Sequence, residues 1–158
     1  MYALATTRFN RETWNEYKRY RKTNNLKGCI YGTPYQMCKK ILLDTTVFIL
    51  EMDNSENRIK GVGMVINNLN LHKYHNIYAY KNYNRYTYKS DYRIDCSEMS
   101  VTELNIINVL NVLLFKTKRH LKRGSGITSV PHKYMKIKYF NFIERFKKMF
   151  VLRGHAPL

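Results

Sequence analysis

The sequence predicts a mixed α/β fold of the α+β type, in which about four helices surround a small, barrel-like β-sheet. Two apolar, β-rich runs, Val47–Met52 and Ile59–Ile66, are joined by five polar turn formers, a pattern typical of a hairpin. Helical periodicity and capping signals occur before and after this hairpin. With 158 residues, 44% of them hydrophobic, the chain can bury one core, and we expect a single domain over residues 1–158.

Gly61 and Gly63 interrupt the second run of the predicted hairpin. Because they lie two residues apart, their missing side chains fall on the same face of the strand. Glycine inside a strand indicates a bend, a bulge or the close approach of another group. We expect these two glycines to accommodate the curvature of the barrel.

The N-terminal segment predicts a helix, a strand and a second helix. Residues 11–22 have helical periodicity, with Asn10 as the N-cap. Residues 27–33 predict a short strand. Thr33-Pro34 has the pattern of an N-cap followed by proline at the first helical position, which predicts a helix over residues 35–43.

The segment after the hairpin predicts a long loop and then further strands. Residues 67–82 are polar and aromatic without a clear period, and a loop of this length in a small domain is often functional. We expect His72 and His75, within this loop, to be surface histidines. Residues 83–95 contain aromatic residues at a spacing of two, which predicts two strands or one bent strand.

The last third of the chain predicts two amphipathic helices. Ser100 and Glu103 have the capping-box spacing before an apolar run, which predicts a helix that ends near Arg123. The sequence Gly124-Ser125-Gly126 would end this helix, either as a plain C-terminal cap or as a turn whose amides bind a phosphate. Residues 133–152 predict the final helix, with aromatic residues on its packing face.

The formal net charge of +17 is concentrated at the two ends of the chain. The balance is +5 in residues 1–27, +1 in residues 28–115 and +11 in residues 116–158. This distribution indicates a polyanionic partner, and the many aromatic residues favour a nucleic acid over a membrane. A merely basic protein without such a partner is the alternative.

Several other classes of protein find no support in the sequence. No apolar run approaches the roughly 18 residues of a membrane span, and the N-terminus lacks the pattern of a signal peptide. The three cysteines have no Cys-x-x-Cys spacing, which favours reduced thiols in the cytoplasm or nucleus over disulfides or a zinc site. No phosphate-binding, hydrolase or metalloprotease motif is present, so we expect no catalysis, no cofactor and no metal.

The order of these motifs resembles that of the YTH domain, which reads N6-methyladenosine in RNA. The YTH domain belongs to the PUA-like superfamily, which also includes EVE domains. Lys27–Thr33, KGCIYGT, is similar to the family's strand that ends in Trp-Ser/Cys-Thr. Residues 47–65, VFILEMDNSENRIKGVGMV, are similar to its hairpin. Ile77-Tyr78 and Tyr83–Tyr86 are similar to the loop that completes its aromatic cage. The resemblance extends from about residue 5 to residue 150 and implies a PUA-like barrel.

The resemblance also implies a binding site for a methylated base. Tyr31, Tyr78 and Tyr83 would form the aromatic cage, each in place of a tryptophan or another apolar residue of the family. Flat aromatic faces hold an extruded base by stacking and can enclose an added methyl group. The carbonyl group of Gly32 would accept the remaining N6 hydrogen.

Two further contacts are implied by the same resemblance. Asn10, with Glu12 as the second candidate, would pair with the edge of the base. The loop that contains Arg123 resembles the family's Arg-Asp-Gly-Gln-Glu segment, which implies a phosphate contact for Arg123. Neighbouring residues would add phosphate affinity without sequence preference, namely Lys118, Arg119, Lys122 and Gly124.

The resemblance, together with the charge distribution, therefore implies an intracellular RNA-binding protein that reads N6-methyladenosine or its cap-proximal 2′-O-methylated form. Its partner would be methylated single-stranded RNA, with DNA less favoured and no membrane involved, and the protein would be a monomer. A cytoplasmic or nuclear location follows, and a virion or an infected cell is compatible. The alternatives are a non-selective packaging protein that binds nucleic acid, and a PUA-like reader of modified DNA bases.

Overall fold

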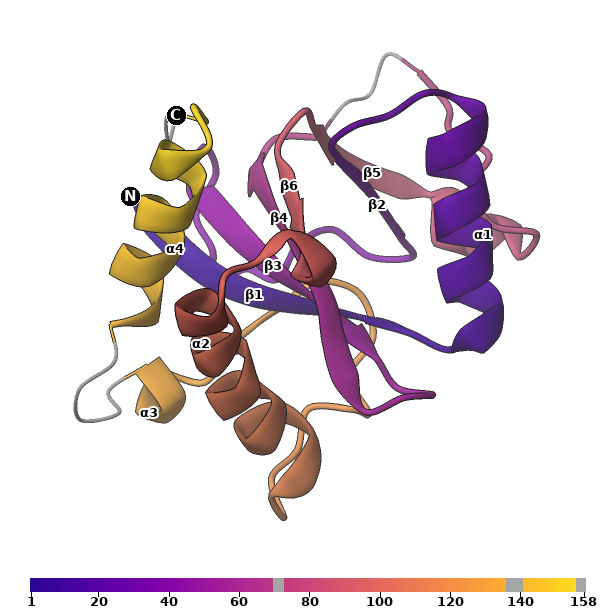
Figure 1. The fold of residues 1–158 in the computed structure, drawn as a ribbon. Coiled ribbons are helices and arrows are strands. Elements are labelled where there is room, and N and C mark those ends of the chain that lie inside the picture. Colours follow the sequence, from indigo (N-terminus) through magenta and orange to yellow (C-terminus); the bar gives the residue numbers. More distant parts are fainter. Residues whose placement is uncertain (70–72, 136–140, 156–158) are drawn as a thin grey trace.

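A mixed five-stranded sheet forms the centre of the molecule in the computed structural model, which describes residues 1–69, 73–135 and 141–155 (Figure 1). The strand order is β6-β4-β3-β1-β7. β1 and β3 are parallel, and the other neighbouring pairs are antiparallel. The strands are β1 (Tyr2–Phe9), β3 (Thr46–Asp53), β4 (Arg58–Ile66), β6 (Arg93–Asp95) and β7 (Thr128–Ser129).

A second sheet pairs β2 (Cys29–Thr33) with β5 (Tyr86–Ser90) in antiparallel register. A turn at residues 91–92 leads from β5 into β6, so one bent segment contributes a strand to each sheet. This confirms the mixed α/β fold, and of the two alternatives predicted for residues 83–95, two strands or one bent strand, the structure has two strands. The strands described for residues 1–69, 73–135 and 141–155 do not close into a barrel.

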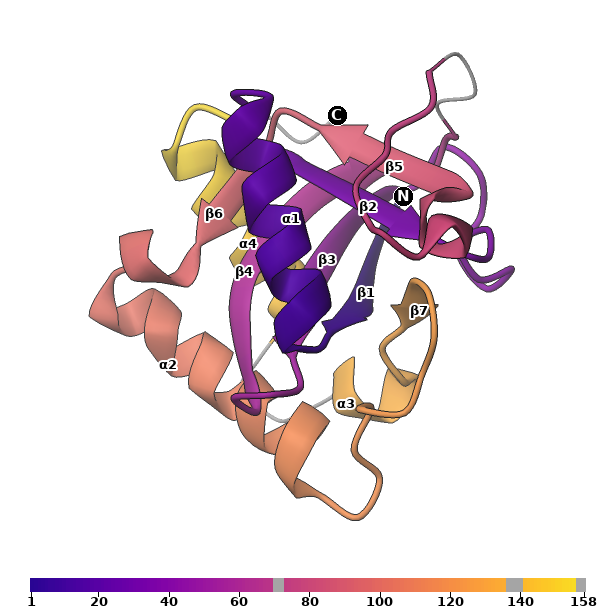
Figure 2. The same cartoon turned by 90° about the vertical axis from the view of Figure 1, so that its right-hand side faces the viewer.

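Both faces of the central sheet are covered, one by α1 together with the second sheet and the other by the remaining helices (Figures 1 and 2). α1 (Arg11–Thr23), β2 and β5 pack on the face that carries Val47 and Ile49. α2 (Val101–Asn111) and α4 (Phe142–Leu152) pack on the face that carries Phe48 and Leu50. The short α3 (His132–Met135) precedes α4, and no helix of the described residues is long and apolar enough to cross a membrane.

A buried polar cluster joins the two sheets and α1. The fully buried carboxylate of Glu51 on β3 accepts hydrogen bonds of 2.8 Å from the hydroxyl groups of both Tyr17 and Tyr31. It also accepts bonds from Nε and Nη2 of Arg93, at distances of 2.6–3.1 Å. Burial raises the pKa of Tyr17 and of Tyr31 well above the ordinary value, so both hydroxyl groups stay protonated and donate. Burial alone would lower the pKa of Arg93, but the Glu51 carboxylate raises it.

Gly61 and Gly63 make room for this cluster, which corrects the expectation that they only allow barrel curvature. A Cβ atom at Gly61 would lie 2.6 Å from Nη2 of Arg93 and 2.8 Å from Oε1 of Glu51. At Gly63 it would overlap the hydroxyl group of Tyr31. The register between β3 and β4 also shifts at Glu51, as in a β-bulge, which re-aims side chains at that point.

The local predictions succeed where capping side chains define the ends of the elements. Asn10 caps α1 in a reciprocal capping box with Thr13, and the predicted hairpin forms between β3 and β4. Ser100 and Glu103 make the predicted capping box at the start of α2. The single helix predicted over residues 133–152 does not form as one, because Asn141 has an extended backbone and caps α4; α3 covers the start of that range, and residues 136–140 lie outside the described residues.

The helix predicted over residues 35–43 is wrong, because the backbone there bonds to distant groups instead. The amide of Met37 donates to the hydroxyl group of Tyr88 at 2.7 Å, and the amide of Cys38 donates to the carbonyl group of Ile127 at 3.3 Å. Thr33 ends β2, and its hydroxyl group donates to the carbonyl group of Tyr35 instead of capping a helix.

The helix predicted to end near Arg123 is shorter. After α2, a π-helical turn covers Val112–Lys116, and Leu121 donates a hydrogen bond back to the carbonyl group of Leu114. Gly124-Ser125-Gly126 is therefore part of a separate loop and not the cap of this helix.

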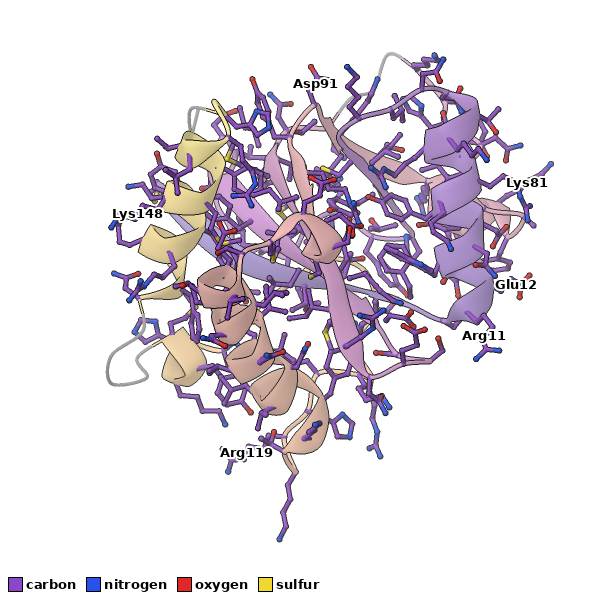
Figure 3. All side chains as sticks on the ribbon, viewed as in Figure 1. Arg11, Glu12, Lys81, Asp91, Arg119 and Lys148 are labelled. Carbon is purple, nitrogen blue, oxygen red and sulfur yellow. The ribbon has the colours of Figure 1, made fainter. Side chains whose placement is uncertain are left out.

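We predict that Glu51→Gln lowers the free energy of unfolding by about 3–5 kcal/mol, because it leaves the buried Arg93 guanidinium without its main counter-charge. Denaturant unfolding would measure the difference. Asp91→Asn is the matched control, since Asp91 lies exposed on the turn between β5 and β6 (Figure 3). Equal stability of the two variants would contradict a dependence of the fold on the Glu51–Arg93 pair.

Candidate functional site

A cavity of about 210 Å³ lies where five segments meet: the end of β1, the end of β2, the start of α1 and two loops, one of which precedes β7. Figure 2 shows how these backbone segments are arranged. Several residues predicted from the sequence lie on the wall of the cavity. The residues that line it include Arg8, Asn10, Gly32, Tyr78, Tyr83, Lys122, Gly124 and Gly126. The structure therefore brings together tyrosines, an asparagine and a basic loop that are far apart in the sequence.

Tyr78 and Tyr83 form the aromatic part of the wall. Their rings are nearly perpendicular, with centroids 6.0 Å apart. Tyr78 is buried, whereas Tyr83 is 38% exposed and has an edge contact with Tyr80 at 4.8 Å. Tyr83 therefore has a ring surface that is accessible to a ligand, whereas Tyr78 mainly supports it.

Gly32 allows residues 73–84, the tyrosine loop, to lie directly against β2. A Cβ atom at this position would lie 2.6 Å from the carbonyl oxygen of Tyr83 and 3.3 Å from the ring of Tyr78. Any larger residue would have to push the backbone of the loop away, because the nearest atom belongs to the backbone and not to a flexible side chain. Glycine at this position thus determines the shape of the cavity.

Asn84 and Glu16 hold the tyrosine loop in place, and neither was predicted as a site residue. The side-chain carbonyl oxygen of buried Asn84 accepts from the amides of Ile77 (3.1 Å) and Tyr78 (2.9 Å), while its Nδ2 donates to the carbonyl group of Tyr78 (2.8 Å). Oε2 of Glu16 on α1 accepts from the amide of Ala79 at 2.6 Å. An asparagine in a polar, aromatic run gives no sequence signal for this role.

Asn10 can act on a ligand only as a hydrogen-bond donor. Its Oδ1 accepts from the amide of Thr13 at 2.8 Å to cap α1, which fixes the orientation of the side-chain amide. Its Nδ2 has no acceptor among the residues that the structure describes and is free to donate. Glu12, the second candidate for the base edge, is exposed on α1 and does not line the cavity (Figure 3).

Tyr31 is not brought to the cavity, which corrects the predicted three-tyrosine cage. Its side chain is 1% exposed and its hydroxyl group is bonded to Glu51 in the core. Successive side chains of a strand point to opposite sides, so Tyr31 and Gly32 cannot both face the cavity. The predicted aromatic wall is reduced to Tyr78 and Tyr83.

The predicted phosphate-binding residues divide into two groups. Lys122 and Gly124 line the cavity. Lys118, Arg119 and Arg123 are exposed and lie outside its wall. Figure 3 shows Arg119 at the surface beyond the end of α2.

Arg8 is a cavity residue that sequence reasoning missed. Its guanidinium group makes five hydrogen bonds of 2.6–3.2 Å, all to uncharged acceptors: the carbonyl groups of Leu121, Gly124 and Gly126 and the hydroxyl groups of Thr6 and Thr128. Burial lowers its pKa to about 10, so it remains charged at neutral pH. Its position as a lone cation in the apolar run YALATTRF is the signal that could have identified it.

Comparison with known proteins found no matching protein family, no matching curated protein and no matching solved structure.

His75 connects the tyrosine loop to α1 and is buried, contrary to the expectation of a surface histidine; His72 lies outside the described residues. Its Nδ1 is 2.7 Å from the hydroxyl group of Tyr20, and its Nε2 has no partner among the described residues. Burial, together with the charges of Lys89 and Lys73, lowers its pKa below the ordinary value of 6.5. The loop therefore favours the neutral imidazole.

We predict that the protein loses stability as the pH falls below about 6.5 and that His75 contributes to this loss. Because the folded pKa is depressed, the unfolded chain binds the extra proton more readily, and its protonation favours unfolding. His75→Gln should make the dependence of the melting temperature on pH shallower. The control His132→Gln changes an exposed histidine and should leave the slope unchanged, so identical slopes for both variants would contradict the role of His75.

Proposed function

We propose that this protein binds single-stranded RNA and reads N6-methylated adenosine, as a monomer with one base in the cavity between Tyr83 and Asn10. The observation that carries the proposal is the meeting, in one cavity, of an accessible aromatic ring, a free amide donor and an uncompensated positive charge. The volume of about 210 Å³ is below the roughly 300–1,000 Å³ of sites for drug-sized ligands and suits a single base.

The chemistry of the wall supports a purine base as the ligand. A base that stacks on an aromatic side chain gains about 1–3 kcal/mol, and Tyr83 offers such a surface. Asn10 can only donate, which matches the ring nitrogens of adenine, since these are acceptors. The resemblance to YTH domains is the reason to expect an N6-methyl group on that base and a PUA-like arrangement of the strands, although the described strands do not close into a barrel. In this proposal the Gly32 carbonyl group accepts the remaining N6 hydrogen.

We predict that RNA with one N6-methyladenosine binds more tightly than unmethylated RNA of the same sequence. Tyr83→Ala should remove most of this difference and cost about 1–3 kcal/mol of binding free energy, because the stacking surface is lost. Titration of both RNAs, followed by fluorescence anisotropy, would measure the ratio of the two dissociation constants.

Tyr74→Ala is the matched control, since Tyr74 is an exposed tyrosine of the same loop region that does not line the cavity. Equal affinities of the wild-type protein for both RNAs would overturn the methyl-reading proposal. Tighter binding of DNA than of RNA in a competition would favour the alternative reader of modified DNA bases, because contacts to the 2′-hydroxyl group favour RNA.

Non-selective binding to nucleic acid is the second candidate function, and the exposed cations outside the cavity favour it. Lys118, Arg119 and Arg123 would attract any phosphate backbone without reading a base.

We predict that changing Lys118, Arg119 and Arg123 together to Gln weakens binding to all RNAs equally. The slope of log K against log salt should become shallower by about 0.7 for each lost phosphate contact with single strands. If the protein reads the methyl group, the ratio of its dissociation constants for methylated and unmethylated RNA stays the same in this triple variant. A non-selective binder has a ratio of one in both the wild-type protein and the variant.

A further inference from the structure

We propose that Arg8 organises a phosphate subsite inside the cavity, so that a base and an adjacent phosphate of the same strand are bound together. This inference rests on the proposed function for the base, but it concerns another part of the cavity wall. It also assigns the phosphate to the backbone amides of the loop at residues 123–126, which Arg8 holds, and not to the exposed side chain of Arg123.

The first step is the charge of Arg8. All five of its N–H groups are occupied, and every acceptor is a carbonyl or hydroxyl group. No carboxylate lies within ion-pair distance of Arg8 among the described residues. Its hydrogen bonds are thus satisfied while its charge is not, and an anion in the cavity would compensate that charge.

The second step is the conformation of the loop that Arg8 holds. The carbonyl groups of Leu121, Gly124 and Gly126 all turn toward the guanidinium group. The amides of residues 123–126 have no acceptor within the described part of the chain. Carbonyl groups that face a cation on one side leave successive amides free on the other, which is how backbone turns bind anions.

The third step is the absence of a side chain at Gly124. A Cβ atom there would lie 2.6 Å from both Cζ and Nη2 of Arg8. Glycine is therefore required for the loop to approach the guanidinium group this closely. Lys122 also lines the cavity next to this loop, and its ammonium group is a further donor to an anion.

Because its donors are all used, Arg8 is a positioning residue and would not touch the phosphate. It would act by holding the loop amides and by supplying positive charge. A purely structural role would only keep the loop folded. The two roles differ in one measurable way: only a phosphate subsite makes the effect of Arg8 depend on the charge of the bound strand.

The test is a double-mutant cycle between the protein and its RNA. One set of oligonucleotides carries N6-methyladenosine with ordinary linkages. In the others, a single uncharged methylphosphonate linkage replaces the phosphate directly 5′ or directly 3′ of that nucleotide. Dissociation constants are measured for the wild-type protein and for Arg8→Gln and Arg123→Gln, two variants that lose the same formal charge.

For the wild-type protein and Arg123→Gln, we expect one of the two neutral linkages to weaken binding by about tenfold, as for loss of one charge-assisted hydrogen bond. For Arg8→Gln the same linkage should change affinity by less than about twofold. Gly124→Ala keeps the charge of Arg8 but displaces the loop, and should behave like Arg8→Gln. Partial unfolding of a variant would weaken all RNAs equally and would leave these ratios unchanged.

Additive effects of Arg8→Gln and both neutral linkages would overturn the subsite. Loss of the linkage effect in Arg123→Gln instead would overturn it in favour of an exposed contact. Equal binding of methylated and unmethylated RNA, with the linkage effect intact, would refute methyl reading and leave the phosphate subsite standing. The two proposals therefore fail separately.

Discussion

The buried ion pair between Glu51 and Arg93 is the interaction on which the arrangement of the two sheets depends. Glu51 lies in the middle of the central sheet, and Arg93 follows the turn at which the chain leaves the second sheet. Tyr17 and Tyr31 add α1 and β2 to the same carboxylate. Burial of two charges is unfavourable unless their attraction and several further hydrogen bonds offset the lost hydration. The charge of Glu51 is therefore stabilised only when β3, β6, α1 and β2 are all in place. A shift of any one of these four segments would break a bond to the carboxylate.

The same cluster determines which residues reach the cavity. Since Tyr31 points toward Glu51, the alternation of β2 places Gly32 on its other side. Because Gly32 has no side chain, the tyrosine loop packs closely on β2, with the carbonyl oxygen of Tyr83 next to the Cα atom of Gly32. Asn84 fixes the loop from within. The shape of the cavity is thus a consequence of core electrostatics, although no residue of the core cluster lines it.

The elements that sequence reasoning predicted correctly are those whose ends depend on nearby side chains. Asn10 caps α1 through a residue three positions away, and the polar turn between β3 and β4 has its own short-range bonds to Asp53. The helix predicted over residues 35–43 fails for the opposite reason. Its amides bond to Tyr88 and Ile127, which are close only in the folded chain. A local sequence pattern gives no information about these distant hydrogen-bond partners, and the helix-start signal of a threonine followed by a proline is too weak to outweigh them.

The candidate site was predicted in part, and the two errors share one physical origin. Tyr31 was assigned to the cavity and Arg8 was left out, yet each position depends on a charge inside an apolar strand: Glu51 in TVFILEMD and Arg8 in YALATTRF. Such charges can be recognised in the sequence, but their partners cannot. The charge of Glu51 is compensated by Arg93, so no ligand is needed to explain why a carboxylate is buried there. Arg8 is half-buried and meets only uncharged acceptors, so the unfavourable free energy of partly desolvating its charge is incompletely offset within the chain. A half-buried charge that folding leaves uncompensated is a stronger reason to expect an anionic ligand than the larger number of exposed cations, because fully hydrated cations need no partner.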